Sequence, residues 1–259
     1  MSSKGDLFFI QRKIDPESFL MDPSKAVQGT FYLYINPGNR NWFWYPILQF
    51  SENYFIQSPD YIASWDPNFA EKHTSVKNIE IEELRTGTED LGGLTPTAGD
   101  YVFLSRKLRR GDKGLRVDTD EVLRRSEIEL KFEEGRRKYA PNAVSRLNCI
   151  YLVDDETVLG KMFKDYSKDY VFKVKIRQQQ NCSKVDVQWY HRYWDACSIT
   201  SDDEDYWGID KEECIKKYWT SFPSDESANN WEYLVDGLVG FVDPRDIKRI
   251  QAIRRGLRL

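Results

Sequence analysis

A short polar segment that leads directly into an apolar one constrains the fold of this chain most strongly. Residues 145–148 read Ser-Arg-Leu-Asn, and most residues from Leu147 to Val153 are apolar. Pro141 precedes this stretch and acidic residues follow it. A bounded apolar run of this kind is typical of a buried strand whose polar first residues lie at the rim of a sheet. The same pattern also fits a core strand with an arginine ion-paired at its edge.

Helices are expected on both sides of this strand. Residues 118–139 begin with good N-cap residues, collect basic residues in their last turn and end before Pro141, which blocks any continuation. After the strand, residues 158–166 carry apolar side chains at helical spacing. This mixture of helices and strands favours the α+β class.

Further elements are expected along the chain. The other strand candidates are residues 7–12, 31–35, 170–176, 185–194, 231–235 and 238–242, and further helices are expected at 211–219 and after Asp243-Pro244. Asp236-Gly237 predicts a tight hairpin turn between the last two strands. Short helices and loops are expected over residues 42–69, and the glycine-rich residues 86–99 predict a long loop.

Composition limits the class of protein. The 259 residues carry a formal net charge of -4, which argues against a protein that coats nucleic acid indiscriminately, although it does not exclude a local basic groove. Neither a secretory signal nor an apolar stretch of membrane-spanning length is found. The 4 cysteines lack the close C-x-x-C spacing of a zinc or redox site. We therefore expect a cytoplasmic protein with reduced thiols, no metal and no membrane partner.

The most basic segment of the chain lies between residues 106 and 116. Arg106, Arg109 and Arg110 stand close together there, with further lysines and arginines around two glycines. Such clustering can follow a phosphate backbone or bind a substrate phosphate. It fits equally well a solvated loop that is paired to the many carboxylates of the chain. These three arginines are the candidate residues for binding an anionic acceptor.

Strong catalytic motifs are absent from the sequence. It contains no phosphate-binding glycine loop, no nucleophile elbow and no zinc-protease helix motif, and it has only 2 histidines. What remains is a set of polar residues at strand ends, namely Arg12, Ser145, Arg146 and Glu232. Glu232 lies between two aromatic residues at the start of an apolar run. If it is buried, it needs a partner or a function, and otherwise it is an exposed residue at a strand edge.

The order of these segments resembles the ADP-ribosyltransferase fold, in its small bacterial and phage branches. The matching segments are the strand 7–12, the charged helix leading into residues 145–151, the following helix, the strand 170–176, residues 217–219, and the strand 231–235 before a turn. The resemblance covers the first strand and most of residues 120–242. It implies a single domain, residues 1–259, with a split mixed β-sheet around an NAD cleft, flanking helices, and residues 36–117 as a large insertion.

The resemblance also implies roles for individual residues. A basic residue at the end of the first strand holds the dinucleotide, and Arg12 or the adjacent Lys13 matches it. Ser145 matches the hydroxyl that supports the nicotinamide ribose, and Arg146 is a second candidate for the phosphates. Glu232 matches the catalytic glutamate, which contacts the ribose and promotes loss of nicotinamide. A fixed carboxylate stabilises the positive charge that develops on the ribose, while an arginine neutralises the pyrophosphate.

Two functions are consistent with these patterns. The first is an NAD-dependent mono-ADP-ribosyltransferase, a toxin or a factor in phage–host conflict with a protein partner such as an antitoxin, which transfers ADP-ribose from NAD to a protein or nucleic acid. It predicts that Arg12, Ser145 and Glu232 meet in one cleft. Asn230 stands where protein-modifying members commonly have Glu or Gln, which leaves the acceptor open. The alternative is a non-enzymatic protein- or nucleic-acid-binding module, in which these three residues are scattered or tied up in surface pairs.

Overall fold

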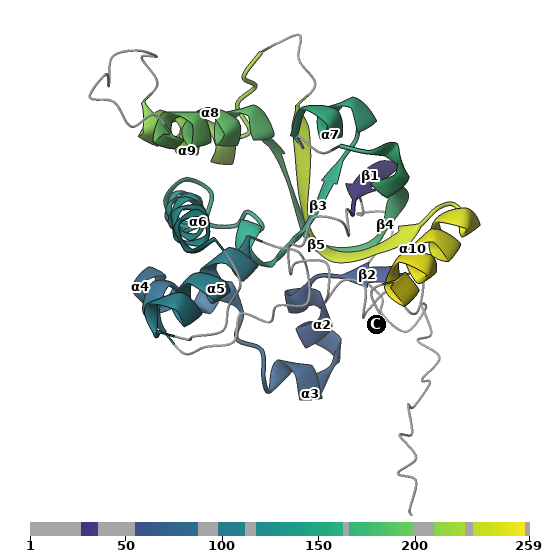
Figure 1. The fold of residues 1–259 in the computed structure, drawn as a ribbon, viewed down its shortest axis with the longest axis horizontal. Helices are drawn as coiled ribbons and strands as arrows, with labels where there is room; N and C mark the ends of the chain where they lie inside the picture. Colours follow the sequence, from purple (N-terminus) through teal and green to yellow (C-terminus); the bar gives the residue numbers. More distant parts are fainter. Residues whose placement is uncertain are drawn as a thin grey trace, which may run out of the picture.

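The computed structural model describes residues 27–35, 55–87, 98–111, 118–162, 166–198, 210–225 and 230–256, which form an α+β fold (Figure 1). The strands are β1 (Phe31–Tyr34), β2 (Phe55–Gln57), β3 (Ile150–Val153), β4 (Val171–Asp186) and β5 (Trp231–Phe241). The α-helices are α2 (Pro59–Trp65), α3 (Pro67–Ala70), α4 (Ile81–Thr86), α5 (Gly99–Arg109), α6 (Thr119–Tyr139), α7 (Glu156–Met162), α8 (Val187–Ser198), α9 (Lys211–Trp219) and α10 (Pro244–Gly256). Short 3-10 helices occupy η3 (Val76–Asn78), η4 (Arg146–Asn148) and η5 (Lys168–Tyr170).

Strand β5 organises the sheet. One of its edges pairs with β3 along its first half and with β2 along its second half, while β4 pairs with β5 from end to end. Strand β1 joins β3 to β4, so the pairings β5–β3–β1–β4–β5 close into a ring. Register shifts in β4, around residues 176–181, bend that long strand as ring closure requires.

The sheet separates two hydrophobic clusters. Along β5, Tyr233 and Val235 belong to the cluster that packs against α10, whereas Leu234 belongs to the cluster formed with α6, α8 and α9. Figure 1 accordingly shows α10 on one side of the sheet and α6, α8 and α9 on the other. Cys149 is fully buried in the second cluster, where it acts as the small hydrophobic residue that was predicted. Glu232, which is two residues from Leu234 along β5, therefore faces the same side as these three helices.

Several predicted elements are confirmed. Helix α6 begins where the Asp118 side chain accepts a hydrogen bond from the backbone N–H of Glu121, at 3.1 Å, and it ends just before Pro141. Helices α9 and α10 and strand β1 also lie where the sequence predicted them. The predicted central strand begins later than expected, because residues 146–148 form η4 and β3 starts at Ile150. The predicted first strand, residues 7–12, lies outside the described residues.

Three predictions about secondary structure are wrong. Residues 185–194 do not form a separate strand: β4 continues to Asp186, and helix α8 follows because Trp189 and Tyr193 have helical spacing and pack together in the cluster of α6, α8 and α9. Asp236-Gly237 is not a hairpin turn but part of the continuous strand β5. The basic residues up to Arg109 lie in helix α5 and not in a solvated loop.

Gly237 has a packing role that explains the wrong hairpin prediction. A Cβ atom at this position would lie 2.3 Å from the backbone oxygen of Gln178, which is closer than two such atoms can approach. The glycine therefore permits close contact between β5 and the irregular part of β4, and it does not supply a turn.

The predicted mixed sheet is also wrong for the described strands, because all of their pairings are antiparallel.

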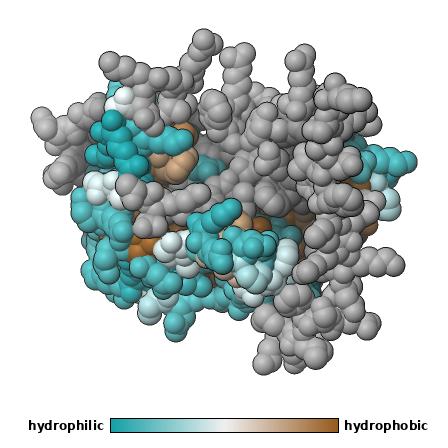
Figure 2. All heavy atoms as spheres, turned by 90° about the horizontal axis from the view of Figure 1, so that it is seen from below, coloured by the Kyte–Doolittle hydropathy of each residue, from teal (hydrophilic) through white to brown (hydrophobic). Residues whose placement is uncertain are grey.

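The surface of the described residues is largely polar. Figure 2 shows one face on which hydrophilic residues make up most of the coloured surface and hydrophobic atoms occupy small areas between them. Among the described residues, the large hydrophobic side chains that stand out as exposed are Phe222 and Val242. Within the same ranges, no helix is long and apolar enough to cross a membrane.

Candidate functional site

Arg146 lies at the centre of a buried polar site beneath α6, α8 and α9. Ser145 caps η4 by accepting a hydrogen bond from the Leu147 N–H at 3.2 Å, and this turn directs Arg146 inward. The guanidinium donates from Nε and Nη2 to the two carboxylate oxygens of Glu129, at 2.9 and 3.2 Å. Its Nη1 donates to the Tyr218 hydroxyl and, at 3.1 Å, to Oε2 of Glu232. We call Glu129, Arg146, Tyr218 and Glu232 the arginine–carboxylate site.

Strand β5 places Glu232 in this site. In the ladder, Glu232 lies between Val153 of β3 and Val185 of β4, and the residue is only 2% exposed. Its Oε2 accepts hydrogen bonds from Arg146 and from the Tyr218 hydroxyl, both at 3.1 Å. Oε1 accepts no hydrogen bond from the part of the chain that the structure describes. Two donors therefore fix Oε2 of this carboxylate.

The protonation of Glu232 is governed by burial. Loss of water raises the pKa of this carboxyl above its ordinary value, and the positive charge of Arg146 and the Tyr218 hydrogen bond only partly offset this effect. The negative charge of Glu129 raises the pKa further. A buried carboxyl with a perturbed pKa beside a specific charge partner is typical of functional sites, although structural ion pairs show the same feature.

Helix α6 supplies two buried glutamates, one turn apart, to the segment that precedes β3. Glu129 binds Arg146, and Glu133 accepts a hydrogen bond from the Ser145 hydroxyl at 2.8 Å. Glu133 is also held by the Arg136 guanidinium, through bonds of 2.9 and 2.7 Å. Two successive residues, Ser145 and Arg146, are thus bound by two glutamates of α6. The i, i+4 spacing of the glutamates places both on one face of the helix.

Aromatic rings enclose the guanidinium. Its central carbon lies 4.2 Å from the ring centroid of Tyr190 and 5.1 Å from that of Tyr151. The Tyr190 hydroxyl donates to Glu129 at 2.7 Å, and the Tyr151 hydroxyl donates to the Arg146 carbonyl at 2.6 Å. Cation–π contacts and hydrogen bonds from the same rings therefore hold Arg146 in one orientation.

The three arginines predicted to bind an acceptor are bonded within the protein. Arg106 is buried, and its Nε donates to the Gly87 carbonyl at 2.6 Å. Arg110 donates to the same carbonyl and, at 3.3 Å, to that of Thr86. Arg109 is 42% exposed and lies 4.0 Å from Glu127. Arg106 and Arg110 thus bind the carbonyls at the end of α4, and Arg109 and Arg110 are the two of these three that are exposed to solvent.

The remaining predicted residues differ in what is known of their position. Arg12 and Lys13 lie outside the described residues, so their contribution stays a prediction. Asn230 is buried beside the start of β5, where its side-chain oxygen accepts a hydrogen bond from Lys161 at 3.3 Å. Its backbone carbonyl accepts a bond from the first residue of α8 at 3.0 Å.

A second buried polar cluster lies where β5 passes from β3 to β2. Asp236 accepts a hydrogen bond from the Ser58 hydroxyl at 2.7 Å, and the Ser58 oxygen in turn accepts one from the Gly237 N–H at 2.8 Å. Lys77 lies 3.8 Å from the other oxygen of Asp236. Burial raises the pKa of Asp236 to about 6, against the opposing effect of Ser58.

Asp60 connects this cluster to η4. One of its oxygens accepts hydrogen bonds from His73 Nε2 at 2.8 Å and from the Asn148 amide at 2.7 Å. The other oxygen accepts a bond from Ser75 at 3.0 Å. Because Asn148 is the last residue of η4, the same short turn is held by Asp60 at one end and by α6 at the other.

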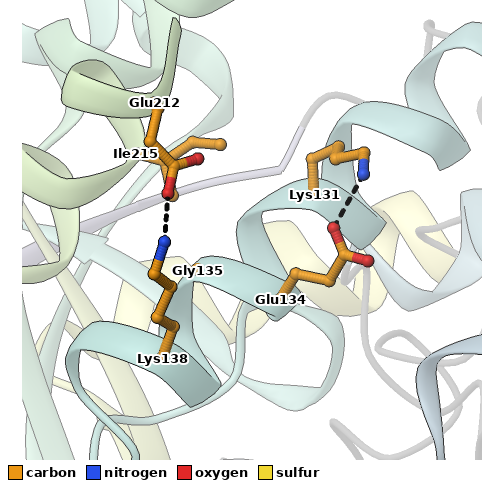
Figure 3. Close-up of a pocket in the computed structure, with 6 residues that line it drawn as sticks. All are labelled: Lys131, Glu134, Gly135, Lys138, Glu212 and Ile215. Atoms are coloured by element: carbon orange, nitrogen blue, oxygen red, sulfur yellow. Dashed lines mark hydrogen bonds and ion pairs between the residues drawn. The ribbon is translucent and has the colours of Figure 1, made fainter.

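A shallow groove of about 270 Å³ lies between α6 and α9 (Figure 3). Its lining consists of Lys131, Glu134, Gly135, Lys138, Glu212 and Ile215. Lys131 pairs with Glu134 at 2.8 Å, and Lys138 pairs with Glu212 at 2.7 Å, as the dashed lines of Figure 3 show. The charges in the groove are thus paired with one another, and none of its residues belongs to the arginine–carboxylate site.

The fold and the site together define an α+β protein with a buried arginine between two carboxylates. Residues 51–251 match the family model described as "Protein of unknown function (DUF2441)", and the chain belongs to this family. No curated protein matches the chain. The matched range includes the whole arginine–carboxylate site, whereas Arg12 precedes it.

Sequence reasoning missed two members of the site, Glu129 and Tyr218. Glu129 and Glu133 form an i, i+4 pair on α6, and each directly follows a buried apolar residue, Ile128 and Phe132. Carboxylates inside an apolar stripe indicate buried partners, because an unpaired charge there is costly. Tyr218 lies on the apolar side of α9, where nothing in the local pattern distinguishes it from a core aromatic residue.

Proposed function

We propose that this chain is an NAD-dependent mono-ADP-ribosyltransferase in which Glu232 is the catalytic carboxylate. The observation that carries the proposal is the state of Glu232: Arg146 and Tyr218 fix Oε2, and Oε1 receives no hydrogen bond from the described residues. A carboxylate oriented in this way can accept a hydrogen bond from a ribose hydroxyl through Oε1. It also stabilises the positive charge that develops on the ribose when the bond to nicotinamide breaks.

The contacts of Arg146 refine its role in this proposal. Both of its terminal nitrogens and Nε are bonded within the site, to two carboxylates and one hydroxyl. Arg146 therefore serves to orient Glu232, and the pyrophosphate is assigned to Arg12. Ser145, which caps the start of the same turn, is the candidate for supporting the nicotinamide ribose. The acceptor is a protein or a nucleic acid.

Nicotinamide release from NAD tests the proposal. The full chain is incubated with NAD in the presence and absence of cell lysate, beside a Glu232→Gln variant, which keeps the shape of the side chain and removes its charge. We expect the variant to lose about 10²-fold or more in rate, the usual effect of removing a charge-stabilising group. Lysate dependence in the unmodified protein would indicate a required acceptor.

Glu213→Gln provides a matched control. Glu213 lies on α9 with a 53% exposed side chain, and it pairs with Lys217 at the surface. This variant should release nicotinamide at the rate of the unmodified protein. The absence of both NAD binding and turnover in the unmodified protein would refute the transferase proposal and favour the non-enzymatic binding module. Equal turnover by Glu232→Gln would remove Glu232 from the reaction.

A further inference from the structure

We propose that Glu129 is a positioning residue with two effects on Glu232. It holds one edge of the Arg146 guanidinium, so that Nη1 points at Glu232. Its negative charge also opposes the ionisation of Glu232. This inference rests on the proposed function, because it assigns Glu129 a part in the same site. Neither the family description nor the sequence patterns single out Glu129.

The planar shape of the guanidinium allows Glu129 to orient Arg146. Nε and Nη2 form one edge of the group, and both oxygens of Glu129 bind that edge at 2.9 and 3.2 Å. A two-point contact of this kind fixes the plane and the rotation of the guanidinium. Nη1 is then left on the opposite side, where it reaches Tyr218 and Glu232. Without Glu129, the guanidinium would be held only through Nη1, by its bonds to Tyr218 and Glu232.

Glu129 is itself well anchored. It is 3% exposed and lies in the middle of α6, and the Tyr190 hydroxyl of α8 donates to its Oε1 at 2.7 Å. The Tyr190 ring also covers the Arg146 guanidinium. Helix α8 thus contacts both members of the Glu129–Arg146 pair, and Glu129 is held in place to position a group on another element.

The charge balance of the site supports the electrostatic effect of Glu129 on Glu232. Two carboxylates share one guanidinium in a buried site, so full ionisation leaves one excess negative charge. Glu129 and Glu232 therefore share the same positive charge, and the negative charge of Glu129 disfavours ionisation of Glu232. The titratable and charged groups that face Glu232 are Glu129 from α6, Arg146 from η4, Cys149 just after η4, Tyr151 from β3, and Tyr218 from α9. Of these, Glu129 is the carboxyl group.

The titration of Glu232 tests the proposal without NAD. Carboxyl carbon signals are followed by NMR in protein labelled with ¹³C-glutamate, and the Glu232 signal is the one that disappears in Glu232→Gln. In Glu129→Gln, the midpoint for Glu232 should move to lower pH, since a neighbouring negative charge is gone and Arg146 is released to pair with Glu232. Glu134→Gln, an exposed change on the same helix, should leave it in place. An unchanged or higher midpoint in Glu129→Gln would overturn the inference.

A second variant separates position from charge. Glu129→Asp keeps the negative charge but withdraws it from Arg146, so the Glu232 midpoint should stay closer to that of the unmodified protein. Its kcat for nicotinamide release should nevertheless fall while KM changes little, because Nη1 is misdirected. An unchanged kcat would overturn the positioning role. If the unmodified protein does not cleave NAD, the proposed function fails, and the NMR midpoints still decide whether the two carboxyl groups are coupled. Glu129→Asp also keeps the test open if Glu129→Gln does not fold.

Discussion

The buried Asp236 should make the protein less stable at neutral pH than in mild acid. Its pKa is raised from 3.8 to about 6, so between these values the native chain holds a proton that the unfolded chain has released. A pKa higher by about 2 corresponds to about 3 kcal/mol of stability. This contribution is fully present below the unfolded pKa and is lost as the pH rises through the native one. Between about pH 4 and about pH 7 the loss amounts to about 2 kcal/mol.

Asp236→Asn should abolish this loss. An asparagine retains the oxygen that accepts the Ser58 hydrogen bond but has no charge to bury. The free energy of unfolding, measured by urea denaturation with tryptophan fluorescence, should therefore favour the variant over the unmodified protein by about 2 kcal/mol more at about pH 7 than at about pH 4. Asp60, His73 and Lys77 lie around the same cluster and are present in both proteins. The difference in unfolding free energy between the two proteins therefore reports the change at position 236.

Asp195→Asn serves as the control, since Asp195 lies exposed on α8. Its effect on stability should be small at both pH values. The reasoning would be refuted if Asp236→Asn cost more stability at about pH 7 than at about pH 4. That result would mean that Asp236 is ionised in the native state and is stabilised there by Ser58 and Lys77.

Three further predictions concern packing, the buried charges and catalysis. A Cβ at Gly135 would lie 2.0 Å from Cγ2 of Ile215, so Gly135→Ala should separate α6 from α9 and cost about 1–3 kcal/mol in urea denaturation. Gly160→Ala, whose nearest neighbour would be 3.8 Å away, should instead gain up to about 1 kcal/mol, and equal effects of the two would contradict this argument. Arg146→Met leaves two buried carboxylates without their cation and should destabilise the native state by about 3–5 kcal/mol at neutral pH; a neutral effect would show that the ion pairs add little. The raised pKa of Glu232 predicts that nicotinamide release falls, on acidification, at a higher pH than an ordinary glutamate would give, and a pH–rate profile with its acid limb below 4.5 would disagree.

The sequence predicted the elements whose signals are local. Helix α6 was recognisable from its N-cap and from Pro141, and α9 from the spacing of its apolar residues. The strand carrying Glu232 was also found, together with the requirement that this residue have a partner if buried. These features depend on neighbouring residues in the chain, and for that reason a single sequence reveals them.

What the sequence did not predict depends on distant contacts. Asp236-Gly237 has the composition of a hairpin turn, but Gly237 is needed because it lets β5 approach β4 closely. The residues that it contacts, Gln178 and Gln179, lie 58 or more residues earlier in the chain. The aromatic residues of α8 have both strand-forming tendency and helical spacing, and packing against α6 and α9 decides in favour of the helix. The partnership of Glu129 with Arg146 joins positions that no local pattern connects.

The position of β5 in the chain has a consequence for how the protein is made. This strand pairs with β2, β3 and β4, yet only α10 follows it among the described elements. During synthesis from the N-terminus, β2, β3 and β4 must therefore wait for their shared partner until β5 itself has been translated. Contacts that join such distant segments also form slowly, because long loops must close first. We expect the complete sheet to assemble only after β5 has been translated, and until then the nascent chain exposes unpaired strands to chaperones.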